Sequence, residues 1–290
     1  MPEADRQNLD AVPNVPGVYV IWLRDGPPHL GRTGVLRRRL KRLLERLKLA
    51  ELAERIEYHL TGSGFESMVA LYRLARRHRR EDYRKFLKLR IPPFLKVNLS
   101  NPYPRCYLTR RLGRDRAVYF GPFTTRGAAE RFQGAFLDLF QMRRCREEMH
   151  PDPAHPGCIY GEMHMCLRPC QAACSPDQYR AETGRVVEFL TSRGRSLLKQ
   201  LEAERDQAST GLEFEQAARL HRRLEKAREA LKLNDELARD VDHLYGVVIQ
   251  RSVEPEAVEL WFLYQGSLQT RQRFSLAVEQ GRPVSLDQRL

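Results

Sequence analysis

The chain lacks the features of a membrane or secreted protein. None of its apolar runs approaches the roughly 18 residues that a membrane-spanning helix needs. The first ten residues are polar, so no secretory signal opens the chain. We therefore expect a cytoplasmic protein with no membrane partner. Disulfides are rare in that compartment, so the six cysteines would be free thiols or metal ligands.

Negative charge is also scarce. The 290 residues include 50 Lys and Arg against 37 Asp and Glu, a formal net charge of +13. This excess favours a polyanionic partner such as DNA, because phosphates exchange their condensed counterions for Lys and Arg. A merely solvated basic surface is the alternative. We expect no small-molecule substrate.

Internal repeats and low-complexity tracts are missing too, so a repeat architecture is not expected. The length suffices for two or three small domains, and the hydrophobic periodicity indicates an α+β chain. Helices are expected over residues 34–59, 65–88, 126–141 and 176–235. Strands and turns are expected over 13–31, 94–123 and 241–275. The first helix would bury a leucine stripe of Leu36, Leu40, Leu43, Leu44 and Leu47.

Four of the cysteines, Cys145, Cys158, Cys166 and Cys170, lie within 26 residues. Thiolates in a compact loop rich in Pro and Gly suit a soft metal or an iron–sulfur cluster. Buried free cysteines are the alternative. The spacing lacks the short CxxC pairs of small zinc domains. Four cysteines nevertheless suit Zn²⁺ and a [4Fe–4S] cluster almost equally well. Cys174 could be a spare ligand.

Two expected helices are strongly basic, and the arginines of the second fall on one side at helical spacing. Such a stripe can follow a phosphate backbone, although a solvated face is the commoner reason for one. We predict DNA contacts without base reading, and the candidate residues are Arg37, Arg38, Arg42, Arg73, Arg77 and Arg80.

The break at Thr210-Gly211 predicts a helical hairpin. Its second arm carries apolar residues at the spacing of one helix face: Phe214, Ala217, Ala218, Leu220 and Leu224. The hairpin either buries this stripe itself or pairs with a similar hairpin on a partner, since two helices alone bury little surface.

Several motifs in the same order resemble the UvrC family over about residues 13–235. Gly17-Val18-Tyr19, His29-Leu30-Gly31-Arg32, Leu36 and Arg39 resemble its GIY-YIG nuclease core. Residues 119–123 match its YFGPF motif, and 158–170, with Cys145 upstream, resemble its cysteine segment. The sequence GLEFEQAARL resembles the UVR motif that pairs UvrC with UvrB. The chain also resembles Cho, a short relative of UvrC.

The resemblance implies a nucleotide-excision-repair protein with DNA and a UvrB-like protein as partners. It implies a degenerate GIY-YIG-like domain over 12–97, a YFGPF and cysteine-rich domain over 98–190, a UVR hairpin over 191–235 and a truncated β-rich segment over 240–290. It implies a [4Fe–4S] cluster rather than zinc at the four cysteines. The UvrB-pairing residues would be Glu213, Phe214, Ala217, Ala218 and Leu220.

The same resemblance places the nuclease residues. Tyr19 matches the general base, and Arg39 matches the arginine that steadies the scissile phosphate. His29 replaces the second tyrosine, and Arg32 replaces the lysine after the glycine. A further family tyrosine falls on Leu43, and the family asparagine before the next strand falls on Lys96.

The family's metal-binding acid falls on Leu71, although Glu66 keeps the first acid of the same helix. Without a carboxylate, Mg²⁺ or Mn²⁺ has no protein anchor, so we predict weak or lost cleavage. One alternative is an active single-site endonuclease that uses Tyr19, Arg39 and either Glu66 or Glu81. The other is a non-catalytic adaptor or regulator of the UvrABC system.

Overall fold

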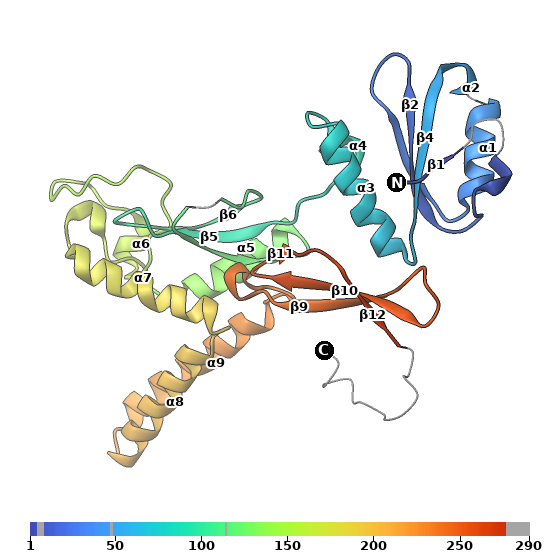
Figure 1. Ribbon diagram of the computed structural model, residues 1–290. Helices are drawn as coiled ribbons and strands as arrows, with labels where there is room; N and C mark the ends of the chain where they lie inside the picture. The colour runs from blue at the N-terminus through green and yellow to red at the C-terminus, as the bar shows by residue number, and fades with distance from the viewer. Residues whose placement is uncertain (5–8, 47–48, 114, 277–290) are drawn as a thin grey trace. The chain divides into compact units, whose positions relative to one another are not determined.

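The computed structural model describes residues 1–4, 9–46, 49–113 and 115–276 (Figure 1). The chain divides into two compact units, one formed by Met1–Arg90 with the residues from Tyr245 onward, the other by Ile91–Leu244. Leu47 of the expected stripe and residues 277–290 of the expected C-terminal segment lie outside the described residues. Among the described helices, none has the length and apolar character that crossing a membrane requires.

The first unit contains an antiparallel sheet in the order β1-β4-β2-β3. Its strands are β1 (Glu3–Ala4), β4 (Ala53–Leu60), β2 (Gly17–Leu23) and β3 (His29–Thr33). The β2–β3 hairpin confirms the strand pair expected over residues 13–31. A short 3-10 turn, Leu9–Ala11, precedes the hairpin.

Helices cover both faces of this sheet. Helix α1 (Leu36–Arg46) packs on the face that carries Tyr19 and Ile21. Helix α3 (Gly64–His78) packs on the face that carries Val20 and Leu30. Four leucines of the expected stripe are buried in α1: Leu36, Leu40, Leu43 and Leu44.

The helix expected over 34–59 is wrong in its second half. A short helix α2 (Leu49–Leu52) ends where β4 begins, and β4 pairs along β2 from Gly17↔Leu60 to Leu23↔Ala53. The residues around 49–54 favour a helix locally. Pairing in the middle of a sheet, with Ile56 buried in the core, outweighs that propensity.

The helix expected over 65–88 is interrupted. Helix α3 ends at His78, and a separate helix α4 (Tyr83–Phe86) follows. Between them the Arg79 guanidinium forms an ion pair with Asp82 at 2.6 Å and lies 4.7 Å from the centre of the Phe86 ring. These contacts fix the turn that joins the two helices.

The C-terminal strands of the first unit form a second sheet, as expected from their period-two pattern. Strand β10 (Ala257–Tyr264) pairs with β9 (Gly246–Arg251), β11 (Ser267–Leu268) and β12 (Gln272–Ser275). Trp261 of β10 is buried and meets Phe65 of α3 edge to face, with ring centroids 5.5 Å apart.

The second unit has an antiparallel sheet in the order β6-β5-β7-β8. Its strands are β5 (Phe94–Asn98), β6 (Cys106–Thr109), β7 (Ala117–Gly121) and β8 (Arg239–Asp240). Helix α5 (Arg126–Leu137) packs on it through a chain of aromatic rings: Phe120, Phe123, Phe132, Phe136 and Phe189. Helix α5 ends four residues before the limit expected from the sequence.

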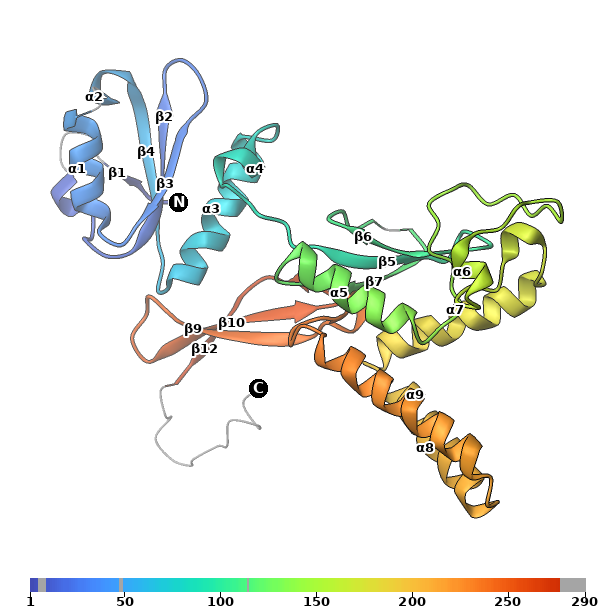
Figure 2. The same cartoon turned by 180° about the vertical axis from the view of Figure 1, so that it is seen from behind.

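The remaining elements of this unit are helical. They are α6 (Ile159–Glu162), α7 (Pro176–Thr191), α8 (Arg195–Thr210), α9 (Phe214–Lys232) and 3-10 turns at Pro169–Gln171 and Val241–His243. The α8–α9 hairpin turns at Gly211, as expected, and extends away from this unit's sheet in both views (Figures 1 and 2). Mixed helices and sheets in both units confirm the predicted α+β class.

Candidate functional sites

Three expected nuclease residues come together at the first sheet. Tyr19 of β2 is buried opposite Gly31 of β3, and its ring stacks on His29 with centroids 6.0 Å apart. A Cβ at Gly31 would lie 2.2 Å from the Tyr19 hydroxyl oxygen, so the tyrosine ring requires glycine there. Burial, followed by the charges of Arg39 and Arg79, lowers the pKa of His29 and keeps its ring neutral at pH 7.

Glu66 lies on the other side of that sheet. It lines a small cavity with Val18, His59 and Arg271. Val18 and Tyr19 are neighbours on β2, so their side chains point to opposite faces. The structure therefore separates the only acid of the expected remnant site from its tyrosine.

The Glu66 carboxylate is already engaged. Ser63 caps α3 by accepting the Glu66 N–H at 3.1 Å, and the carboxylate accepts the N–H of Gly62 at 2.8 Å. The guanidinium of Arg271, the residue before β12, forms an ion pair with the same carboxylate and lies 3.7 Å from Glu259 of β10. Glu66 therefore caps a helix and links α3 to the second sheet of this unit.

The other expected nuclease positions lie apart from Tyr19. Arg32 follows Gly31 on β3 and so points to the opposite face of the sheet. Leu71 packs on the same opposite face, against the cluster that contains Val20, and Glu81 is exposed after α3. Within the described ranges, no group of three or more His, Cys, Asp or Glu side chains is placed to hold a metal ion.

Two positions where the family residue is replaced have structural roles. Leu43 is buried in the α1 core. Lys96 of β5 pairs with Asp115 at 2.5 Å, and the Tyr119 hydroxyl donates to the same carboxylate at 2.6 Å. The hydrogen bond to Asp115, followed by that to Tyr119, raises the pKa of Lys96.

The four expected metal ligands lie in the second unit, near enough for their thiols to interact electrostatically, but among the described residues they are not placed as a group that could hold a metal ion. Burial, opposed by the backbone N–H of Arg168 and supported by the nearby thiols of Cys145, Cys158 and Cys170, raises the pKa of Cys166 to about 11. Burial also raises the pKa of Cys170, with added contributions from Cys158 and Cys145. Each of these effects requires the sulfur atoms to lie near one another, although loop segments separate them in sequence.

The two other cysteines fall outside this group. Burial is the main cause of the raised pKa of Cys174, and Cys170 is the thiol that adds to it. Cys106 lies in β6 within the hydrophobic core, where burial raises the pKa of its thiol to about 12. Neither thiol is among the main causes of the raised pKa of Cys166 or Cys170, apart from the influence that Cys174 shares with Cys170.

A buried arginine that sequence reasoning missed lies beside them. The guanidinium of Arg143, a residue only 4% exposed, donates to the carbonyls of Tyr103 at 2.8 Å and Glu147 at 2.9 Å. It also lies 3.4 Å from the Cys145 sulfur, while the backbone N–H of Arg168 lies 3.4 Å from the Cys166 sulfur. Both donors favour thiolates over thiols. The Arg-Arg pair that precedes Cys145 was the available signal.

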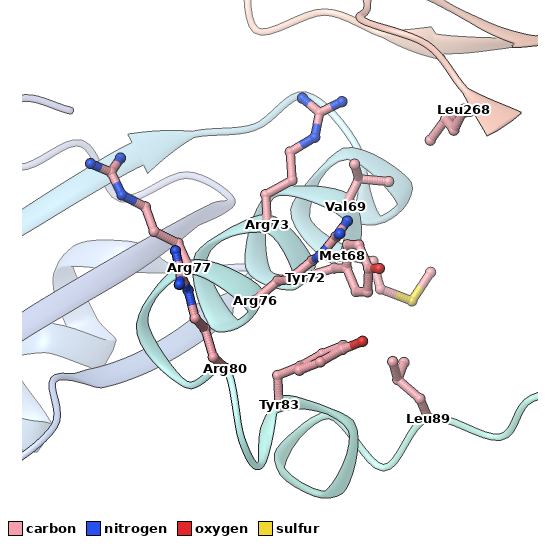
Figure 3. A pocket seen from close by; sticks show the side chains of 10 residues that line it. All are labelled: Met68, Val69, Tyr72, Arg73, Arg76, Arg77, Arg80, Tyr83, Leu89 and Leu268. Atoms are coloured by element: carbon pink, nitrogen blue, oxygen red, sulfur yellow. The ribbon is translucent and has the colours of Figure 1, made fainter.

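The expected DNA-contacting residues form two separate sets. Arg73, Arg77 and Arg80 line one groove of about 870 Å³ on α3, together with Arg76 (Figure 3). The groove also contains Met68, Val69, Tyr72, Tyr83, Leu89 and Leu268. The set on α1 lies on the other face of the sheet: Arg38 and Arg42 are exposed, and Arg37 donates to the Val12 carbonyl at 2.6 Å.

The expected partner-binding stripe on the hairpin is divided. Leu224 is fully buried and Leu220 is partly buried between the helices, whereas Phe214 at the tip is 68% exposed. Glu213 and Ala218 are exposed, and Ala217 is half-buried. Leu212, which the motif did not single out, is 71% exposed in a left-handed conformation. The tip therefore presents two unpacked apolar side chains.

Comparison with known proteins gives a consistent pattern. The family model for the middle domain of the UvrC/Cho excinucleases matches residues 92–189. UvrABC system protein C of Methanothermobacter thermautotrophicus is 29% identical over 280 residues, which cover 92% of this chain and 46% of that protein. The proteins of the same name from Acetivibrio thermocellus and Lachnospira eligens are 26% and 27% identical, covering 93% and 95% of this chain and 45% and 47% of their own length.

The chain thus spans about half the length of the curated relatives it matches. No solved structure matches it.

Proposed function

Because the chain belongs to the UvrC family, we propose that it is a DNA-binding protein of nucleotide-excision repair with weak or lost endonuclease activity. In this proposal the basic surfaces of the first unit contact DNA. The cysteine segment holds a [4Fe–4S] cluster, and the α8–α9 hairpin pairs with a UvrB-like protein.

The observation that carries the loss of nuclease activity is the position of Glu66. Its carboxylate accepts the Gly62 N–H and pairs with Arg271, on the sheet face opposite Tyr19. The position expected for the metal-binding acid holds Leu71, packed against apolar neighbours. The His29 ring stacks on Tyr19, and in this proposal Arg39, whose charge contributes to the lowered pKa of His29, holds a phosphate. Among the described residues, no group of three or more His, Cys, Asp or Glu side chains is placed there to anchor Mg²⁺ or Mn²⁺.

A nicking assay tests this part of the proposal. The full chain is incubated with ultraviolet-damaged supercoiled plasmid and Mg²⁺ or Mn²⁺, with and without a UvrB-like protein. We expect conversion to the nicked form at the rate of the Tyr19→Phe variant in every condition. Robust incision that Tyr19→Phe abolishes would instead support an active single-site endonuclease.

The cysteine segment has the chemistry of a cluster site. The pKa values of Cys166 and Cys170 are raised by burial and then by neighbouring thiols, and the Arg143 guanidinium and the Arg168 N–H lie 3.4 Å from the sulfurs of Cys145 and Cys166. When bound, an iron–sulfur cluster supplies a redox-active centre and cross-links the loop segments that its cysteines come from. Zn²⁺ is the alternative occupant.

Pairing with a UvrB-like protein is supported by the hairpin tip. Leu212 and Phe214 are 71% and 68% exposed, and they extend beyond the part of the hairpin that packs on the second unit. Large apolar side chains at the tip of a protruding element are typical of a protein-binding surface.

A further inference from the structure

The groove on α3 and α4, defined above by its ten lining residues, combines two kinds of surface. Four guanidiniums line it: Arg73, Arg76 and Arg77 come from α3, and Arg80 comes from the turn that follows (Figure 3). Tyr83 comes from α4, and Leu89 and Leu268 complete the apolar side. A site for phosphate alone would need only the arginines.

The positive charge of the groove is not neutralised by an ion pair with any described residue. Throughout the described chain, none of the four arginines forms an ion pair with a carboxylate, whereas the neighbouring Arg79 pairs with Asp82. Arg73 lies over the Trp261 ring at 5.6 Å. Close guanidiniums repel one another, and a bound polyanion relieves that repulsion.

The aromatic part of the groove is held in place before any ligand binds. Tyr72 and Tyr83 meet edge to face with centroids 6.0 Å apart. The Arg84 side chain donates to the Tyr83 hydroxyl at 3.1 Å, and the Arg79–Asp82 pair fixes the turn that positions α4. Met68 and Leu89 beside these rings are 54% and 42% exposed.

We propose that this groove binds unstacked nucleotides of a single-stranded DNA segment, with the arginines on the phosphates and Tyr72 and Tyr83 against the bases. The inference rests on the DNA-binding role proposed above and deepens it. Positively charged grooves that carry aromatic side chains are the usual way to bind single strands without reading sequence. The volume of about 870 Å³ lies within the roughly 300–1,000 Å³ range of small-ligand sites.

A double helix can contact the arginines of the groove through its phosphates but leaves the aromatic and apolar side chains uncovered. Duplex bases are stacked and paired, so they could not cover the rings of Tyr72 and Tyr83 or the exposed Met68 side chain. An unstacked base would cover these apolar atoms while its phosphate meets the arginines. This requirement for both contacts separates the proposal from general backbone binding.

The test is fluorescence anisotropy of the full chain with a labelled dT12 strand and a labelled 12-base-pair duplex. We expect Tyr72→Ala and Tyr83→Ala to weaken dT12 binding roughly tenfold and to leave duplex binding within twofold. Tyr72→Phe and Tyr83→Phe keep the ring and should bind dT12 like the parent. Tyr107→Ala is the matched control, because Tyr107 lies under Arg105 in the second unit.

A second measurement does not depend on substitution. Ultraviolet cross-linking of a strand that contains 5-iododeoxyuridine should attach to a peptide that contains Tyr72 or Tyr83. Cross-links found only elsewhere, or alanine variants that bind dT12 like the parent, would overturn the proposal. Duplex binding that survives in that case leaves the DNA-binding role standing, whereas a parent chain that binds neither ligand refutes both.

Discussion

Single residues decide the chemistry of the cysteine site. Ser in place of Cys145, Cys158, Cys166 or Cys170 should remove most of the iron from protein purified without oxygen, because a cluster needs all four thiolates. Cys106→Ser and Cys174→Ser are the matched controls and should retain it, since neither thiol belongs to the group of four. Iron content and visible absorbance measure the outcome. A colourless protein with stoichiometric zinc would contradict the cluster.

Arg271 shows how one side chain can hold a sheet to a helix. Arg271→Ala leaves the carboxylate of Glu66, whose side chain is 2% exposed, without its cation, so we expect a loss of about 2 kcal/mol in the free energy of unfolding. Both tryptophans, Trp22 and Trp261, belong to the first unit, so their fluorescence in urea reports this loss.

The control for Arg271 is a double variant. Glu66→Gln combined with Arg271→Ala removes the charge as well as its partner, and it should recover part of the lost stability. If Arg271→Ala unfolds at the same urea concentration as the parent, the ion pair does not stabilise the unit.

At the scale of single residues, the sequence predicts where a side chain lies when its partners are close in the chain or belong to the same motif. Tyr19, His29 and Arg39 come together as their motif implies. The pairing of Glu66 with Arg271 has no local signal, because the two residues are far apart in sequence and only the tertiary fold of the unit brings them together.

Among the elements, the α8–α9 hairpin offers a separable test. Phe214→Ala at the exposed tip should weaken binding of a UvrB-like protein by tenfold or more while leaving the melting temperature unchanged, as expected for an apolar anchor outside the fold. Leu224→Ala is the contrast, because this side chain is fully buried and its loss should cost about 2–4 kcal/mol.

Titration calorimetry and thermal melting by circular dichroism separate these effects. Equal partner affinity for Phe214→Ala and the parent would refute a binding role for the tip.

The sequence predicts an element well where its apolar period is continuous. It predicts an element poorly where pairing with a distant segment determines the secondary structure. The β2–β3 hairpin, the C-terminal strands and the break at Gly211 follow from local pattern and turn residues. The sequence predicts helix where strand β4 forms, because the residues before β4 are helix formers and its strand conformation depends on pairing with β2. The break between α3 and α4 depends on the Arg79–Asp82 pair, which a helical period cannot reveal.

On the scale of the whole molecule, the three histidines with lowered pKa values all belong to the first unit. Burial is the largest cause for His29, His59 and His78, and nearby arginines add to it. Each ring binds a proton less readily in the folded unit than in the unfolded chain. The stabilisation is therefore complete above the ordinary pKa of 6.5 and is lost as the pH falls through the window below it.

We therefore expect the first unit to unfold at lower urea concentration at pH 5.5 than at pH 7.5, as followed by the fluorescence of Trp22 and Trp261. The formal charge of +13 grows as histidines are protonated, so self-repulsion acts in the same direction. Replacing all three histidines by glutamine should flatten the dependence, because no protonation is then linked to their burial. If the triple variant retains the full pH dependence, other groups control the stability of the unit.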